Sequence, residues 1–561
     1  MSPRSRVILP ALAAGLLAGV SWQPLRAAVA PPAGAALAAQ AGGAPSAQHK
    51  FDLGITPEAA RRTGPDGISF EEAVKRALIY SAGANHVQHV TIQLMLQHEL
   101  DRRKAEGEPL QQVEIADGAV ELALQQKMEE VGSQENPSGL GFWEQLDLLG
   151  FTPETYREDV LRTNLLLDGM FFPEDPDQWP EDLLKRIFEA GSENSYWDTQ
   201  MVELRESMRQ AKAEGKDYPV DEFMRTLIMR GPVLRWLTKN VPSREPFMGL
   251  PEGVALRVGS VSVPTDELLA KCWTVVGPVD KRNAVAWVET LWKTQEALRK
   301  RGVLMSPQEA ADLMVAEAKE YEGSIISYEQ VALQFLGFPT MEAYRSWHRL
   351  RQSFRKSLPD PYPADLLQEH LALRGSFLAG ARVDAEVILI SARDPRTGLF
   401  PRTGDPFGAA AARAEEAKAK LAGGAEWSAV LAEYSDYPEA YPGAAQGMPQ
   451  PHRGRLGPLE LNPLREFLGE TEYQDFVTGV NLADQIFFEA EKGAVYGPVR
   501  GAIGYFFFRV NDRLPATREI FLEPVEGQST EDDVNRHRFL VGDDYLSLHF
   551  REFVNQAAAQ K

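Results

Sequence analysis

The chain has a single cysteine, Cys272, among 561 residues. One thiol cannot form an intramolecular disulfide, so the fold must be stabilised by the packing of its cores. The surrounding sequence, LLAKCWTVV, offers only Lys271 to activate a thiolate. We therefore expect Cys272 to be a buried apolar residue, with a catalytic thiol as the alternative.

The chain lacks an excess of positive charge, because 80 acidic residues outnumber 59 basic ones and the formal net charge is −21 at pH 7. Binding to nucleic acid requires a basic surface, so no nucleic-acid partner is expected. The same negative charge slows the approach to anionic membranes. The acidic residues are dispersed along the chain rather than gathered in long blocks, which is typical of solvated helix faces.

Catalytic and metal-binding motifs are also scarce. The chain has nine histidines but no HExxH motif, and it has neither a GxSxG motif nor a phosphate-binding loop. His86 and His89, with His98 further along, have helical spacing and could ligate a metal. They lie on an apolar-periodic helix, so packed or surface histidines are the preferred interpretation. No metal and no cofactor are predicted.

Long hydrophobic runs are confined to the start of the chain. Arg4 and Arg6 precede an apolar run, and a small-x-small pattern follows at residues 28–30. This order predicts an export signal over 1–30, followed by a flexible linker rich in Ala, Pro and Gly over 31–65. The run is shorter than the roughly 20 apolar residues of a membrane-spanning helix. An uncleaved anchor is the alternative, and membrane contact is expected only in that case.

The middle of the chain has the pattern of helices. A chain of this length is expected to form about three to four domains. Apolar-periodic stretches with charged faces predict helices within 70–104, 114–128, 156–171, 203–212 and 284–301. Proline-rich breaks occur at 171–180 and 241–251, and the second is the better domain boundary.

Two similar segments indicate an internal repeat. Residues 148–157 read LLGFTPETYR and residues 335–345 read FLGFPTMEAYR. Each places Leu-Gly-Phe before a turn and Tyr-Arg at the start of a helix. Upstream of the second copy, Ser306 and Glu309 have the spacing of a capping box. The alternative is a chance similarity between short helical hairpins.

The region of the second copy resembles a known family. Residues 254–269 read VALRVGSVSVPTDELL, which predicts a short strand, a turn and the start of a helix, and a long helix downstream ends in Arg301-Gly302-Val303. This order is similar to the N-terminal domain of SurA-like periplasmic chaperones. The resemblance implies two SurA-N-like helical modules, at 66–250 and 251–381. It also implies that a helix in the C-terminal strand and helix tail, 516–561, packs back onto the helical part.

The last third of the chain alternates between strand and helix patterns. Strands are expected at 384–391 and within 493–514, where turn residues bound aromatic and β-branched runs. Helices are expected at 408–421, 427–434 and 482–490. This order resembles the parvulin-type peptidyl-prolyl isomerase domain, and we assign it residues 382–515. The predicted fold class is α+β, with mostly helical modules followed by a small antiparallel sheet.

The resemblance extends to short motifs that would form the isomerase site. Residues 385–389, AEVIL, stand where parvulins have Ala-x-His-Ile-Leu, and residues 504–510, GYFFFRV, stand where they have Gly-Tyr/Phe-His-Ile-Ile-Lys-Val. Val387 and Phe506 thus occupy the positions of two histidines. Neither side chain can hydrogen-bond, although both suit a half-buried strand.

The other site positions follow from the same resemblance. Leu456 and Phe488 occupy apolar pocket positions, with core packing as the alternative reading. Asp436 lies near the acidic position, and Tyr437 stands where the carboxylate would align. We therefore predict Asp436 as the only catalytic candidate. The predicted substrate-binding residues are Val387, Tyr437, Leu456, Phe488 and Phe506.

Together these features predict a periplasmic, chaperone-like protein. Its partners would be unfolded or proline-containing polypeptides, held in apolar grooves between the helical modules and the parvulin-like sheet. Uncatalysed prolyl isomerisation takes roughly 10–100 s, and the loss of both histidines predicts weak or absent catalysis. The alternatives are an active isomerase with a rearranged site near Asp436 and an envelope scaffold protein.

Overall fold

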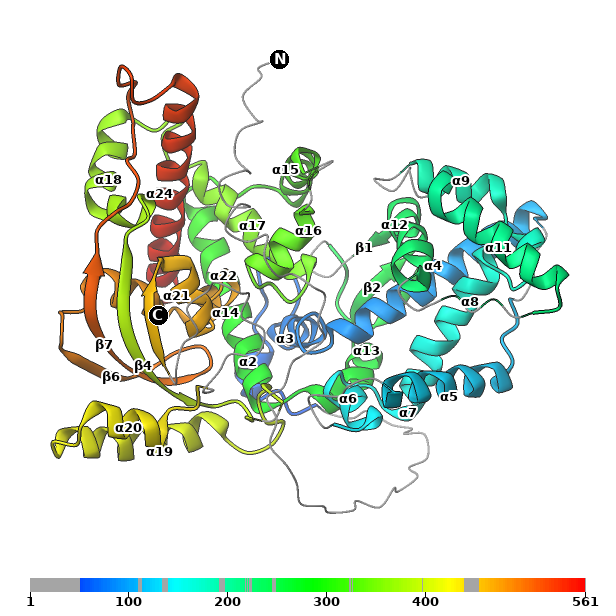
Figure 1. Cartoon of the computed structure of the whole chain (residues 1–561), viewed down its shortest axis with the longest axis horizontal. Helices are drawn as coiled ribbons and strands as arrows, with labels where there is room; N and C mark the ends of the chain where they lie inside the picture. The colour runs from blue at the N-terminus through cyan, green and yellow to red at the C-terminus, as the bar shows by residue number, and fades with distance from the viewer. Residues whose placement is uncertain are drawn as a thin grey trace.

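A computed structural model describes residues 51–559, except for 109–112, 134–139, 191–196, 217, 219, 221–223, 245–248, 322–323, 325, 396 and 438–453. The predicted export signal lies outside the described residues. Helices dominate the structure, and two small antiparallel sheets accompany them (Figure 1). The predicted α+β class is therefore confirmed.

The elements run in three stretches, in which η marks a 3-10 or π-helical turn. The first stretch contains α2 (Pro57–Ala60), α3 (Phe70–Ile79), α4 (Ala84–Glu106), α5 (Asp117–Ser133), α6 (Phe142–Leu148), α7 (Pro153–Thr155), η1 (Tyr156–Leu161), α8 (Arg162–Phe171), η2 (Pro176–Gln178), α9 (Glu181–Glu189), η3 (Trp197–Met201), α11 (Val202–Ala213), η4 (Met224–Arg230), α12 (Gly231–Asn240) and β1 (Ser243–Arg244). The second contains β2 (Val254–Val258), β3 (Val261–Pro264), α13 (Thr265–Cys272), η5 (Trp273–Val275), α14 (Pro278–Lys300), α15 (Pro307–Glu320), α16 (Tyr328–Gln330), η6 (Val331–Phe335), α17 (Met341–Arg355) and α18 (Ala364–Leu378). The third contains β4 (Arg382–Ser391), α19 (Pro406–Ala422), α20 (Trp427–Tyr434), β5 (Arg455–Leu459), α21 (Leu461–Leu468), α22 (Glu472–Thr478), α23 (Leu482–Asp484), η7 (Gln485–Glu489), β6 (Val495–Arg500), β7 (Gly504–Leu514) and α24 (Glu531–Ala559).

Helix α14 lies at the centre of the helical part and contacts α3, α17, α22 and α24. The sequence favours a helix that begins at Pro278, because proline suits the first helical position and Asp280 accepts a hydrogen bond from the N–H of Gly277 (2.8 Å). Helix α3 comes from the first expected module and α14 from the second. One apolar core therefore runs through both, and the break at 241–251 marks a change of sequence pattern rather than a division of this core.

The start of α15 agrees with its sequence signature. The Ser306 hydroxyl accepts a hydrogen bond from the N–H of Glu309 (3.2 Å), and the Glu309 carboxylate accepts one from the N–H of Ser306 (2.7 Å). The predicted capping box is confirmed. Upstream, the expected single strand before α13 is instead a hairpin of β2 and β3, which pairs with β1 in a sheet of order β1-β2-β3.

The two Leu-Gly-Phe motifs have the same local backbone. Gly150 and Gly337 both have positive φ, +93° and +72°, a region in which glycine carries no steric penalty. Thr152 and Thr340 then cap the next helix, each accepting a hydrogen bond from the N–H three residues later. We refer to residues 117–161 as the first hairpin and to residues 307–355 as the second hairpin.

The second sheet has the strand order β5-β4-β7-β6 and is antiparallel throughout. Successive side chains of a strand point to opposite faces. Val387 and Leu389 of β4 accordingly pack with residues of α21, α23 and η7. Ile388 and Ile390 pack on the other face, with residues of α19 and α20. Figure 1 shows α19 and α20 together along one side of this sheet.

Helix α24 returns to the helical part, where it contacts α14, α17, α18 and α22 (Figure 1). Aromatic contacts fasten it, because the ring of Phe553 stacks on Phe354 at 5.1 Å and Phe550 contacts Trp347 at 6.1 Å. The docking of a C-terminal helix that the resemblance implied is therefore present.

Residues 51–65, expected as part of the linker, pack against the helical part. Leu53 is buried in the large core, and Arg62 forms an ion pair with Glu289 of α14. None of the helices in the described ranges combines the length and the apolar character that crossing a membrane would require.

Candidate functional site

Val387 and Phe506 lie on the same face of the sheet β5-β4-β7-β6. In the register of β4 and β7, Val387 is opposite Phe508 and Leu389 is opposite Phe506. Both predicted site residues therefore point into the cluster that also contains Leu456 of β5. The structure brings these three side chains together, as a shared site would require.

Helices cover this face of the sheet. Leu464 and Leu468 of α21 belong to the same cluster, as do Leu482 of α23 and Ile486 of η7. Val387 and Phe506 each have 0% of their surface exposed, and Leu456 has 1%. In this arrangement the three side chains act as core residues, and a peptide would reach them only if the covering helices moved.

Asp436 is held away from these residues. Its carboxylate accepts two hydrogen bonds from Arg413 of α19 (2.8 and 2.9 Å) and one from the N–H of Ser391 (2.7 Å). Helix α19 covers the opposite face of the sheet from Val387 and Phe506. The hydrogen bonds that Arg413 donates to Asp436 also raise the pKa of Arg413. A carboxylate engaged in this way anchors the end of α20.

Tyr437 and Phe488 lie at different depths in the domain. Tyr437 is buried in the same cluster as Val387, and its hydroxyl donates a hydrogen bond to the carbonyl of Phe467 (2.8 Å). Phe488 is only partly buried and lies at the margin of this cluster, with the Arg374 guanidinium 4.5 Å above its ring. Of the predicted set, Phe488 is the residue with partly exposed apolar surface.

The sequence reasoning passed over a charged pair beside the predicted site. Glu386 and Arg509 face each other across β4 and β7, and the Arg509 Nε donates to the Glu386 carboxylate at 2.7 Å. Arg455 of β5 adds a second ion pair at 3.3 Å. Glu386 lies in the motif at 385–389 and Arg509 in the motif at 504–510. Pairing these two motifs as neighbouring strands would have indicated the ion pair. Two arginines thus share one glutamate across the sheet.

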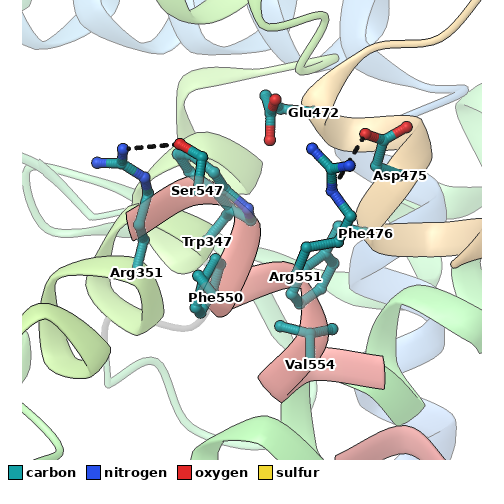
Figure 2. Close-up of a pocket in the computed structure, with 9 residues that line it drawn as sticks. All are labelled: Trp347, Arg351, Glu472, Asp475, Phe476, Ser547, Phe550, Arg551 and Val554. Carbon is teal, nitrogen blue, oxygen red and sulfur yellow. Dashed lines mark hydrogen bonds and ion pairs between the residues drawn. The ribbon is translucent and has the colours of Figure 1, made fainter. Parts of the chain in front are cut away.

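Figure 2 shows a small pocket where α17, α22 and α24 meet. The dashed contacts in it join Arg351 to Ser547 (3.2 Å) and Arg551 to Asp475 (3.8 Å). Burial raises the pKa of Asp475, which Arg465 opposes from 2.8 Å. The cavity measures about 20 Å³, the space of roughly one water molecule. It belongs to the packing of α24 and is too small for a peptide.

An open groove lies beside α5, in the first hairpin. Its volume is about 830 Å³, within the range of ligand clefts. Leu122 and Met128 of α5 are exposed in it, and Trp143 of α6 lines it as well. The sequence pattern predicted helix α5 but not the exposed face that lines this groove. Which face of α5 is covered depends on the tertiary packing of the neighbouring helices.

The histidines that had metal-like spacing serve in packing. The rings of His86 and His89 lie 4.8 and 5.4 Å from Phe151, and His86 Nε2 is 2.9 Å from the carbonyl of Gly150. Burial lowers the pKa of His89 to about 4. In the described part of the chain, no cluster of three or more His, Cys, Asp or Glu side chains is placed to hold a metal ion.

Cys272 is fully buried, as expected. Its thiol lies 3.4 Å from the carbonyl of Leu269, and burial raises its pKa to about 12. A thiol in this state is protonated at neutral pH and unreactive.

Comparisons with known proteins give little more. No protein-family model matches the chain, and no curated protein matches it. Among solved structures, the chain is similar to PrsA from Bacillus subtilis, with 17% identity and a TM-score of 0.16 over 53% of this chain and 88% of that one. A similarity of this size supports no conclusion about activity or partners.

Proposed function

We propose that this protein is an exported, chaperone-like protein that holds unfolded or newly exported polypeptides, with a parvulin-like domain that catalyses prolyl isomerisation weakly or not at all. The observation that carries the proposal is the groove beside α5, where Leu122 and Met128 are exposed. Exposed apolar surface of this kind typically marks a binding site. Methionine adapts to ligands of different shape, which suits a protein that accepts many sequences.

The predicted weak catalysis is supported by the surroundings of Val387, Phe506 and Asp436, which stand at or near the polar positions of the parvulin site. Catalysis requires interactions that strengthen in the twisted transition state of the peptide bond. Val387 and Phe506 are apolar and buried in the sheet core, while Arg413 neutralises Asp436. These side chains offer an incoming proline no hydrogen-bonding group that is both free and directed at the same space.

Two assays on the purified full chain test this proposal. It should suppress the aggregation of a chemically unfolded protein in proportion to its own concentration. It should leave the cis–trans relaxation of a proline-containing tetrapeptide at the uncatalysed rate. A failure to suppress aggregation would favour the envelope scaffold. Rapid isomerisation that disappears in Asp436→Ala would instead establish the rearranged isomerase site.

Export belongs to the same proposal and has its own test. The order of basic, apolar and small residues at the N-terminus supports cleavage after Ala30. Mass spectrometry of the protein recovered from its native cell should then find a mature chain beginning at Pro31. An intact Met1 terminus in a cytoplasmic fraction would contradict this part of the proposal.

A further inference from the structure

The groove beside α5 is surrounded by negative charge. Between residues 114 and 158 the sequence has ten acidic and only two basic side chains, Lys127 and Arg157. Arg162 pairs with Asp117 and Glu158, and Arg402 pairs with Asp147, which reduces this acidic excess but does not remove it. Arg157 is already paired, because its Nε donates to the carboxylate of Glu121 at 2.6 Å. Glu129 lies on the groove with a single neutral partner, the Gln125 amide at 2.9 Å. The rim therefore has an excess of acid that favours a basic ligand.

The floor of the groove is a strip along one helix. Most residues of α5 that line it recur at intervals of three and four, which places them on one face; the lining residues of α5 are Gly118, Glu121, Leu122, Leu124, Gln125, Met128 and Glu129. Val120 packs into the core of the first hairpin, and Leu124 lies at the border between that core and the groove. At a rise of 1.5 Å per residue, the strip is about 16 Å long. That length matches about three turns of a bound helix.

We infer that this groove binds amphipathic polypeptide segments whose apolar face is flanked by Lys or Arg. This inference rests on the proposed function and names the class of client segment. The apolar face would cover Leu122, Met128 and Trp143, as in other helix-in-groove complexes. The basic residues would meet the acidic rim, which selects against acidic segments by repulsion.

The second hairpin provides the contrast that makes the inference testable. There, polar side chains fill the space between α15 and α17: the Tyr328 hydroxyl donates to Glu317 at 2.6 Å, and His348 Nε2 lies 2.8 Å from the same carboxylate. Val315 on α15 is 58% exposed, as much as Leu122 at 57%. Val315 is therefore a matched control for an exposed apolar residue outside the groove.

The test uses the full chain and three fluorescent 16-residue peptides. One has an amphipathic Leu and Met pattern with Lys flanks, one has the same pattern with Glu flanks, and one is a scrambled Lys peptide. Fluorescence anisotropy should give at least tenfold tighter binding of the first peptide, weakening between 0.1 and 0.5 M salt. Leu122→Ser and Glu129→Lys should each reduce that affinity several-fold, with Val315→Ser unchanged and circular dichroism unaltered in all three variants.

The outcomes separate this inference from the proposed function. Equal affinity for the three peptides, or equal losses in Leu122→Ser and Val315→Ser, would overturn the inference even if the chain still suppressed aggregation. Self-association that is lost in Leu122→Ser would also overturn it, because the occupant would then be a second copy of the chain. Tight, selective binding without any suppression of aggregation would uphold the peptide class and overturn the chaperone function.

Discussion

The first and second hairpins begin from nearly the same sequence and end in different environments. Phe151 of the first hairpin packs against His86, His89 and Tyr156, within a small separate core. The equivalent Phe338 belongs to the large core, and its ring contacts include Trp287, Trp347 and Tyr473. The local sequence thus specifies the turn, while neighbouring elements determine how much of each hairpin is covered.

One pair of equivalent residues shows this difference most clearly. Glu154 and Glu342 each stand two residues after the capping threonine. Glu154 is exposed, whereas Glu342 is 2% exposed and neither of its buried carboxylate oxygens accepts a hydrogen bond. The second hairpin therefore contains a strained electrostatic position, and the first hairpin keeps the open face that forms the groove.

The largest effect is expected where the two phenylalanines are removed. Phe338→Ala should lower the free energy of unfolding by about 3–5 kcal/mol, because a large side chain leaves a cavity in the main core. Phe151→Ala should cost clearly less, since its smaller core can collapse around the change. Urea titrations followed by circular dichroism measure both values. If Phe338→Ala fails to fold, Phe338→Leu provides the comparison, and equal losses at the two positions would contradict the difference in environment.

The glycines of the two motifs should respond alike. A Cβ at Gly337 would lie 2.5 Å from the Cβ of Thr471, and one at Gly150 would lie 2.6 Å from Val275 Cγ1. Each position also has positive φ, so alanine adds backbone strain. We expect Gly337→Ala and Gly150→Ala each to lower the free energy of unfolding by about 1–3 kcal/mol. The melting temperature should fall accordingly. A neutral result at either glycine would show that its turn can adopt another conformation.

The smallest effect is expected at Glu342, and it should depend on pH. Burial raises the pKa of Glu342 well above its usual 4.5, so the folded protein retains a proton that the unfolded chain releases. The stability linked to this group is complete below about pH 4 and is lost as the pH rises toward the folded-state pKa. Glu342→Gln should therefore raise stability by about 1 kcal/mol at pH 8 and leave it unchanged at pH 4.

The matched control for that substitution is the equivalent exposed residue. Glu154→Gln should leave the melting temperature unchanged at both pH values, because Glu154 is solvated in the folded and unfolded states. The measurement is the melting temperature of the unsubstituted chain, Glu342→Gln and Glu154→Gln at pH 4 and pH 8. A loss of stability in Glu342→Gln at pH 8 would mean that Glu342 is ionised and held by Arg345, whose guanidinium lies 3.9 Å away.

Much of the local structure could be predicted. The Ser306 capping box, the helix at 427–434 and the strand–turn–strand at 493–514 are all present, because each depends on residues close in the sequence. The predicted strand at 384–391 is lengthened by two residues at its start, to Arg382. Strand β3, which begins at Val261, was not predicted, because it forms only by pairing with β2.

The sequence alone determined the position of most helices, the Ser306 capping box, the similar turns of the two Leu-Gly-Phe motifs, and that Cys272 would be a buried apolar residue. These properties depend on backbone sterics, capping and composition, which act over a few residues. Only the tertiary structure decided that helices bury Val387 and Phe506, that Arg413 binds Asp436, and that an open groove lies beside α5. Burial and ion pairing depend on which distant elements meet, and that information is spread over the whole chain.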